Sequence, residues 1–182
     1  DAHAEVNAIN SVHHRTLLQD AALYTNLEPC LHFGRTPPCT NLIIENKIKQ
    51  VIIGTTDTNP LVKGKGIEKL INAGVDVKVG TLEKECRELN KRFFIFHEKK
   101  RPYIILKWAQ TLNNFIAETG SDKTKTTKYV GSDESLKVVH QWRNEEAAIM
   151  VGTTTVLADN PQLTVRHILG KNPIRITLDK HL

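Results

Sequence analysis

The stretch from Leu27 to Cys39 reads LEPCLHFGRTPPC, and the fold is predicted outward from it. Eight residues lie between Cys30 and Cys39, and each cysteine directly follows a proline. A histidine, His3, stands near the start of the chain. Zinc in proteins prefers imidazole nitrogen and thiolate sulfur in a tetrahedral site, and three protein ligands leave a fourth position open for water, as catalytic zinc requires. The pattern therefore predicts a catalytic zinc site held by His3, Cys30 and Cys39.

Glu5 follows His3 by two residues, where its carboxylate can move protons at the metal without binding it. Zinc nucleobase deaminases carry a His-x-Glu and a Pro-Cys element, with the glutamate as general acid and base. Each of these signals is common by chance, and two cysteines can be buried thiols, but the combination favours zinc. Pro38 suits the first turn of a helix beginning near Cys39, whose positive dipole end would stabilise a thiolate.

The chain around these motifs alternates between apolar strands and amphipathic helices. In the first half we expect strands at 22–24, 51–54 and 75–79, and helices at 40–47, 66–73 and 83–96. This alternation predicts a layered α/β domain. Cys86 lies in the last of these helices without other ligand residues near it, so we interpret it as an ordinary thiol.

A charged segment at 97–102, which ends in a proline, is expected to separate two domains at residues 1–101 and 102–182. The second domain should contain strands at 103–106, 148–151 and 174–178, and a helix at 132–143. The sequence begins two residues before its zinc motif and ends soon after its last strand. We therefore expect a piece cut from a longer chain at both ends.

The composition is typical of a folded protein, with 40% hydrophobic and 25% charged residues. We find no signal peptide and no apolar run of the roughly 18 residues that a membrane helix needs, so we expect a cytoplasmic protein without a membrane partner. The 3 cysteines do not form a secreted disulfide scaffold. The net charge of +5 is scattered and lacks interleaved aromatic residues, which favours solvated loops or small-phosphate contacts over a nucleic-acid surface.

The zinc motifs closely resemble the deaminase signature of the bifunctional deaminase and reductase of riboflavin biosynthesis, a family in which the wide cysteine spacing is usual. The resemblance continues through Asp57-Thr58-Asn59-Pro60 and Gly64-Lys65-Gly66. It implies a cytidine deaminase-like three-layer α/β/α domain that hydrolytically deaminates 2,5-diamino-6-ribosylamino-pyrimidinone 5'-phosphate. In this family the equivalents of His3, Cys30 and Cys39 bind zinc, and the equivalent of Glu5 moves the protons. The deaminase substrate would contact His32, Asp57 and Asn59.

The second half resembles the start of the family's reductase domain, which has a dihydrofolate reductase-like α/β fold. Gly152 with Thr155, and the segment ADNPQLTVR at 158–166, carry this resemblance. It implies an oxidoreductase that uses NADPH to turn the ribosyl group into ribityl. NADPH would contact Tyr129, Thr155 and Asp159. The reductase substrate would contact Lys107, Thr127, Arg143, Leu163 and Arg166. The chain departs from the family at Gln110, Asn113-Asn114 and Tyr129.

Simpler roles stay open for several of these residues. Asp57, Asn59 and the segment Asp159-Asn160-Pro161 suit turns in any protein. Arg143, near the end of an expected helix, could offset the helix dipole, and His32 could be a solvent-facing loop residue.

Two other functions are alternatives to the riboflavin hypothesis. One is another zinc nucleoside deaminase or a tRNA adenosine deaminase, which the reductase-like second half disfavours. The other is a non-catalytic, zinc-stabilised module that binds nucleic acid. The family resemblance further implies a homo-oligomer for the intact parent. We do not expect NADPH reduction by this chain alone, because a dihydrofolate reductase-like domain closes its nucleotide site with later strands.

Overall fold

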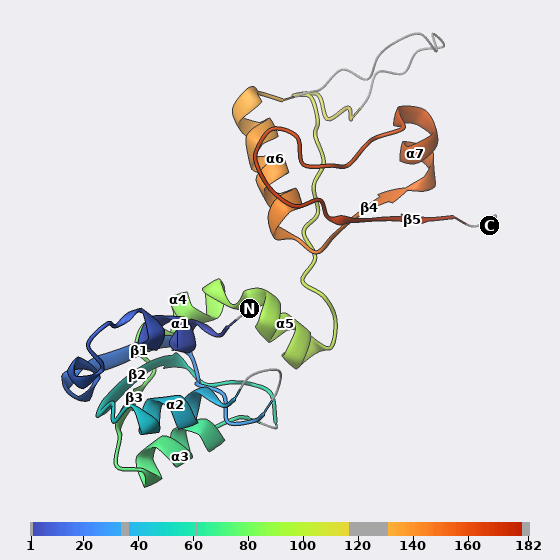
Figure 1. Cartoon of the computed structure of the whole chain (residues 1–182). Coiled ribbons are helices and arrows are strands. Elements are labelled where there is room, and N and C mark those ends of the chain that lie inside the picture. The colour runs from blue at the N-terminus through green and yellow to red at the C-terminus, as the bar shows by residue number, and fades with distance from the viewer. Residues whose placement is uncertain (1, 34–36, 61, 117–130, 180–182) are drawn as a thin grey trace. The chain divides into compact units, whose positions relative to one another are not determined.

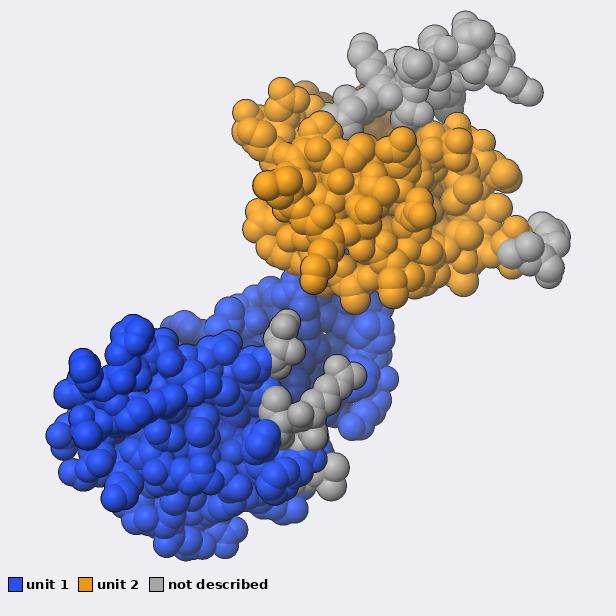
Figure 2. Space-filling model, in the orientation of Figure 1, with its two compact units in different colours: residues 1–105 blue, residues 106–182 orange. Residues whose placement is uncertain are grey.

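The computed structural model describes residues 2–33, 37–60, 62–116 and 131–179. The chain folds into two compact units, residues 1–105 and residues 106–182, which Figure 2 shows in different colours. Each unit has its own sheet and its own helices. Within the described ranges, no helix combines the length and the apolar character that crossing a membrane would take.

The first unit is built on a parallel sheet with the strand order β1 (Ala22–Leu27), β2 (Gln50–Thr55) and β3 (Asp76–Val79). The central strand reads QVIIGT and is buried from its second residue onward. Such a β-branched run is typical of a parallel strand that is covered on both faces. Because Leu27 pairs with Thr55, the carboxyl ends of β1 and β2 meet at one edge of the sheet.

Helices cover both faces of this sheet, as Figure 1 shows for α2 and α3 on one side and α4 on the other. The first layer contains α1 (Ala4–Ser11), α2 (Cys39–Glu45) and α3 (Lys65–Asn72). A short 3₁₀ helix, η1 (Arg15–Asp20), lies between α1 and β1 in the chain. Its buried core joins the helices to β2 through Ile9, Leu18, Ile43, Ile48, Val51, Ile53, Leu70 and Val75. This layer holds the candidate ligands at its edge.

The second layer begins with α4 (Glu83–Leu89), which lies against the opposite face of β2. A Cβ at Gly54 would stand 2.2 Å from Cys86 Sγ, so the missing side chain lets the helix approach the strand. Neighbouring strand residues point to opposite faces of a sheet, so Ile53 faces the first helix layer and Gly54 faces α4. The expected three-layer α/β/α arrangement is therefore present.

We expected one continuous helix at 83–96, and this was wrong. The structure has two helices there, α4 and α5 (Lys91–Lys99). Asn90 separates them, with φ of −99° and ψ of 20°. Its side-chain Nδ2 donates to the carbonyl of Cys86 at 2.9 Å, the same carbonyl that its backbone N–H reaches at 3.1 Å. A side chain that competes for a helical carbonyl ends the helix locally.

The second unit contains α6 (Asp133–Glu145) and the parallel pair β4 (Ala148–Gly152) and β5 (Ile174–Leu178). Ser132 begins α6, because its hydroxyl accepts the backbone N–H of Ser135 at 3.2 Å. A further helix, α7 (Thr153–Asp159), connects the strands and was not expected from the sequence. It ends at Asn160, whose φ of 40° lies in the left-handed region.

The strand expected at 103–106 does not form: these residues have no strand partner among the described residues. A strand is stabilised by a neighbour, and the two-stranded sheet of this unit pairs only β4 with β5. Among the described residues of the second unit, only His140 and Pro173 are buried. The segment is apolar, as the sequence shows, but it has no described ladder of hydrogen bonds to a neighbouring strand.

Candidate metal centre and neighbouring sites

The structure brings together the imidazole and the two thiols that the motifs predict. His3 directly precedes α1, Cys30 follows the end of β1, and Cys39 is the first residue of α2. Their ligand atoms all lie within 4.8 Å of one another. The Nδ1 atom of His3 is 3.5 Å from Cys30 Sγ and 3.3 Å from Cys39 Sγ. His3 is exposed and Cys39 is buried, so the site lies at the surface with one wall in the core.

These separations fit a tetrahedral zinc ion. Zinc binds nitrogen at about 2.1 Å and sulfur at about 2.3 Å, so two such ligands at a tetrahedral angle stand about 3.6 Å apart. The two nitrogen-to-sulfur distances, 3.5 and 3.3 Å, are close to that value. Two thiols and one imidazole are also the donor set that favours zinc over calcium or magnesium.

The end of β1 is tied directly to the start of α2 around Cys30. Its sulfur accepts the backbone N–H of Cys39 at 3.2 Å, and its carbonyl accepts both the N–H and the hydroxyl of Thr40 at 3.2 Å. The local backbone therefore sets the spacing of the two sulfurs across the eight intervening residues.

Burial raises the pKa of the Cys39 thiol far above its usual range, and the nearby Glu5 carboxylate and Cys30 raise it further. From the sequence, we expect the helix dipole to favour a thiolate at Cys39. In the structure, burial and the Glu5 carboxylate outweigh the effect of the dipole. A bound cation must therefore displace a proton from Cys39. The same interaction establishes that Glu5, which is half-buried in the first turn of α1, lies beside the ligand cluster.

Glu28 is a functional candidate that the sequence reasoning missed. Its side chain is only 4% exposed, and its carboxylate accepts four backbone N–H groups. These donors come from Asp57, Gly64, Gly66 and Ile67, at distances of 2.9 to 3.4 Å. The signal available in the sequence was a charged residue between an apolar strand and Pro29, a position where an unpaired carboxylate would be costly.

The motif Gly64-Lys65-Gly66 has a physical cause in this structure. Gly64 has a φ of 76°, which a side chain disfavours. At Gly66, a Cβ would stand 2.4 Å from the carbonyl oxygen of Pro29. The start of α3 can therefore lie against the residue that precedes Cys30 only because residue 66 is glycine.

The residues expected at the deaminase substrate lie on loops that follow β1 and β2. Asp57 is buried and comes two residues after β2, and its Oδ1 accepts the N–H of Asn59 at 2.7 Å, as in an Asx turn. Asp57 thus performs the turn role that the sequence left open. His32 is exposed on the loop that follows β1. Ligands in open α/β sheets bind at such carboxyl ends.

Three residues expected at the reductase substrate are brought together in the second unit. Arg143 donates to the carbonyl of Thr164 at 3.0 Å from the last turn of α6. Arg166 donates from its side chain to Gln162 Oε1 and Thr164 Oγ1. Leu163, half-buried with a φ of 55°, lies in the same loop. Arg143 therefore joins a helix to this loop, which is more than an offset of the helix dipole.

His140 is completely buried at the centre of this group and was also missed from the sequence. Its Nδ1 accepts the backbone N–H of Arg166 at 3.0 Å, and its ring contacts the ring of His167. Burial, with smaller contributions from Arg143, His167 and Arg166, lowers its pKa to about 4. A neutral imidazole has one proton, so Nε2 carries it and faces the Arg143 guanidinium at 3.3 Å.

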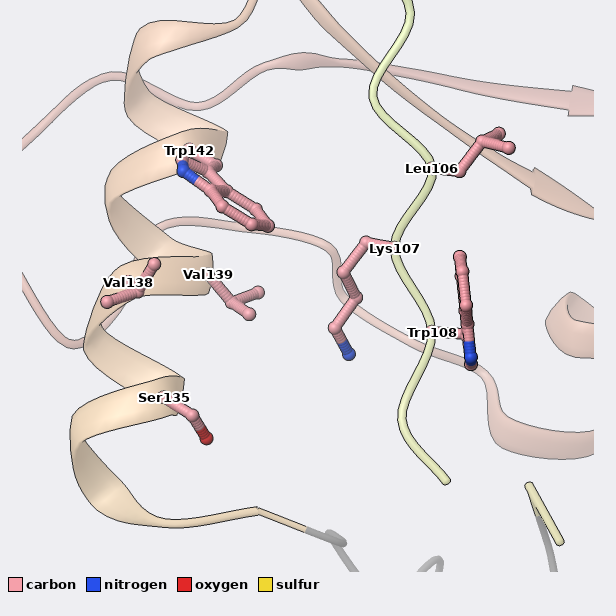
Figure 3. A pocket seen from close by; sticks show the side chains of 7 residues that line it. All are labelled: Leu106, Lys107, Trp108, Ser135, Val138, Val139 and Trp142. Carbon is pink, nitrogen blue, oxygen red and sulfur yellow. The ribbon is translucent and has the colours of Figure 1, made fainter. Parts of the chain in front are cut away.

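The remaining reductase residues lie on α7, on the segment at 106–108, or outside the described residues. Thr155 and Asp159 are exposed on α7. Lys107 lines an open pocket of about 430 Å³ in the second unit, formed by residues 106–108 and one side of α6. Figure 3 shows its side chain between the extended segment and the helix that carries Val139 and Trp142. Thr127 and Tyr129 lie outside the described residues.

A parallel α/β sheet with an imidazole and two thiols at the carboxyl ends of its strands defines a domain of the zinc-dependent cytidine deaminase class. Residues 1–55 match the family of the cytidine and deoxycytidylate deaminase zinc-binding region, and residues 102–182 match the RibD C-terminal domain. The chain belongs to the family of the riboflavin biosynthesis protein RibD.

Individual relatives cover nearly the whole chain. It is 50% identical over 181 residues to the riboflavin biosynthesis protein RibD of Aquifex aeolicus, covering 99% of this chain and 49% of that protein. It is 47% identical over 180 residues to the RibD protein of Actinobacillus pleuropneumoniae, covering 99% of this chain and 46% of the relative. The chain therefore spans about half the length of these relatives.

Solved structures confirm the fold class. A diaminohydroxyphosphoribosylaminopyrimidine deaminase/5-amino-6-(5-phosphoribosylamino)uracil reductase from Thermotoga maritima is 46% identical, with a TM-score of 0.88 over 100% of this chain and 50% of that one. RibD of Acinetobacter baumannii is 31% identical with a TM-score of 0.83, over 100% of this chain and 52% of the other. The chain thus contains a cytidine deaminase-like domain followed by the start of a dihydrofolate reductase-like domain.

Proposed function

We propose that the first unit is the zinc-dependent deaminase of riboflavin biosynthesis, acting on 2,5-diamino-6-ribosylamino-pyrimidinone 5'-phosphate. The observation that carries the proposal is the cluster of His3, Cys30 and Cys39 with Glu5 beside it. The name of the Thermotoga maritima relative, which includes this deaminase activity, supports the choice of substrate.

The chemistry is a hydrolysis in which water replaces the amino group of the pyrimidine ring. A bound zinc ion supplies Lewis acidity at the position that the three ligands leave open. The Glu5 carboxylate accepts a proton from the attacking water and returns it to the leaving nitrogen. A carbon-to-oxygen bond forms, the carbon-to-nitrogen bond breaks, and ammonia leaves. His3, Cys30 and Cys39 would hold the ion, which leaves Glu5 to move the proton.

The loops that carry His32, Asp57 and Asn59 supply the proposed substrate contacts. They follow β1 and β2 at the edge of the sheet where Cys30 also lies. Asp57 is held in a turn by Asn59, and this turn gives the substrate a fixed surface to bind. A phosphorylated riboside is larger than the pyrimidine ring, so these loops would contact the parts of it that do not react.

The second unit, in this proposal, belongs to the NADPH-dependent reductase of the same parent protein. The match of residues 102–182 to the RibD C-terminal domain supports this. Lys107, Arg143, Leu163 and Arg166 are proposed for its substrate, and Thr155 and Asp159 for NADPH. A cytoplasmic location is part of the proposal, because thiols that serve as metal ligands persist in a reducing compartment.

Ammonia release from three candidate substrates tests the function. The zinc-loaded chain is offered the phosphorylated diaminopyrimidine riboside, cytidine, and a tRNA anticodon stem. Release from the first alone is the expected result. Release from cytidine or from the tRNA stem would assign the chain to another deaminase of the class. Binding of the tRNA stem without any release would support the nucleic-acid-binding alternative, and its loss with added salt would show that the contact is electrostatic.

A further inference from the structure

A buried carboxylate, that of Glu28, connects the end of β1 to the loop at 57–67. We propose that Glu28 is a positioning residue of the proposed deaminase, and that it sets substrate affinity through this loop rather than metal binding. The inference rests on the proposed function, because Asp57 and Asn59 of the loop are the proposed substrate contacts. Glu28 itself touches backbone N–H groups and has no described contact with the ligand cluster.

Both oxygens of the Glu28 carboxylate accept hydrogen bonds from the loop. Oε2 accepts the N–H groups of Asp57 at 3.1 Å and Gly64 at 3.0 Å. Oε1 accepts those of Gly66 at 2.9 Å and Ile67 at 3.4 Å. The donors lie 29 to 39 residues further along the chain. One side chain therefore closes the whole loop, from the end of β2 to the first turn of α3.

The described residues of the loop also form hydrogen bonds with one another. Asn59 donates to Asp57 Oδ1 at 2.7 Å, and the carbonyl of Asn59 accepts the N–H groups of Val62 and Lys63 at 2.9 Å. Lys65 then donates to the carbonyl of Val62 at 2.9 Å. The Glu28 N–H continues the strand pairing by donating to the carbonyl of Thr55 at 3.0 Å. Any movement of Glu28 therefore moves the Asp57–Asn59 turn with it.

Backbone N–H groups, rather than a cation, are the described partners of the Glu28 carboxylate. No described lysine, arginine or histidine forms an ion pair with it. Two of its donors, Gly66 and Ile67, lie in the first turn of α3, where unpaired N–H groups and the helix dipole favour a negative charge. Hydrogen bonds to a charged acceptor are about twice as strong as neutral ones. The carboxylate is therefore matched to this position by charge as well as by shape.

Glutamine would fit the same space but not the same bonds. Its side chain has one oxygen and one NH2 group, and the NH2 would face backbone N–H donors at two of the four contacts. The E28Q variant should consequently loosen the loop while leaving His3, Cys30 and Cys39 in place. The matched control is E68Q, since Glu68 is exposed in the first turn of the same helix.

The experiment compares zinc content, amide hydrogen exchange and steady-state kinetics of the wild type, E28Q and E68Q. For E28Q we expect full zinc occupancy, faster exchange of the Asp57, Gly64 and Gly66 amides, and a KM raised by about tenfold or more with kcat nearly unchanged. E68Q should behave as the wild type. Unchanged exchange and an unchanged KM in E28Q would overturn the proposal, and so would loss of zinc, or a lower kcat at constant KM.

Two further measurements separate the possible failures. If the wild type releases no ammonia from the pyrimidine riboside, the proposed function fails, and the exchange data alone then decide whether Glu28 holds the loop. If E28Q does not fold, the wild type is examined for scalar couplings across the hydrogen bonds from the Gly64 and Gly66 nitrogens to the Glu28 carboxyl carbon. Their absence would overturn the proposal. The E28D variant, which keeps the charge but shortens its reach, should then show the same rise in KM.

Discussion

In the proposed function, the residues of the ligand cluster would hold a cation and a neighbouring residue would move protons. His3, Cys30 and Cys39 are within ligand distance of one another, whereas Glu5 lies beside them on the first turn of α1. The proposal therefore assigns metal binding and proton transfer to different side chains, and substitution can separate the two roles.

The Glu5→Gln variant should keep its zinc and lose deamination by about a hundredfold or more, the usual scale for removing a general acid and base. Glutamine preserves the size of the side chain but cannot accept the proton. Zinc analysis and ammonia release on the same preparation check this. Near-normal turnover by zinc-replete protein would assign proton transfer to another group.

The His140 imidazole should titrate with a pKa of about 4, far below the ordinary value of 6.5. The main cause is burial, followed by the electrostatic effects of Arg143, His167 and Arg166, the groups that face it. The unfolded chain binds the proton first as the pH falls. The second unit should therefore lose stability as the pH drops from about 6.5 through about 4.

Urea unfolding followed by tryptophan fluorescence checks this, since both tryptophans, Trp108 and Trp142, lie in the second unit. The midpoint should fall across that pH range, and His140→Gln should reduce the dependence. A ring that titrates at 6.5 or above in an NMR experiment on the wild type would contradict the assignment.

The cluster of His3, Cys30 and Cys39 could be predicted from the sequence because metal binding restricts both residue type and spacing, and the structure brings these three residues together. Glu28 and His140 could not, since both accept hydrogen bonds from backbone N–H groups, which any sequence supplies. A sequence shows which side chains are present, whereas the importance of these two residues comes from backbone groups that lie beside them only in the folded chain. Asp57 shows the intermediate case, because its turn role was visible but its burial was not.

Secondary-structure elements were predicted well where one periodicity dominates. The buried run in β2 and the amphipathic pattern of α3 and α6 gave the correct element with small differences at the ends. The failures have local causes. Asn90 divides one expected helix into two, and residues 103–106 have apolar character without a pairing strand. A periodic pattern in the sequence does not show which side chain competes for a helical carbonyl or which strand pairs with which.

The start of α3 should be sensitive to a single methyl group. A Cβ at Gly66 would stand 2.4 Å from the carbonyl oxygen of Pro29, so Gly66→Ala should lower the free energy of unfolding by about 1–3 kcal/mol. Gly152→Ala is the control, because it has a φ of −75° and no described atom within 4 Å of the added carbon. Urea unfolding of both variants, followed by circular dichroism, gives the comparison. Equal stability of Gly66→Ala and the wild type would mean that α3 starts further from Pro29.

The whole molecule consists of two units that differ in how much core they contain. The first unit has eight buried hydrophobic residues in one cluster that joins three helices to β2. In the second unit, neither β4 nor β5 has a buried residue in the described structure. Stability against local opening follows burial, so the units should open independently.

Hydrogen exchange should therefore be slowest for the amides of β2 and much faster for those of β4 and β5. Both sheets are parallel, so the comparison holds strand type constant. Mass spectrometry of peptides that cover residues 50–55, 148–152 and 174–178 measures it. Comparable protection in the two sheets would show that the second unit has a source of stability other than buried side chains.

In polymer terms, the ligand cluster is a potential cross-link. A cation held by His3 and Cys39 would close a loop of 36 residues, the difference between positions 39 and 3, and this loop contains α1, η1 and β1 but neither β2 nor β3. Closing a loop of that length removes conformational freedom from the unfolded chain worth on the order of 3–4 kcal/mol. Stripping the cation would restore that freedom to the unfolded chain and so lower the stability of the first unit, in which Ile9 and Leu18 would still pack the same segment against β2.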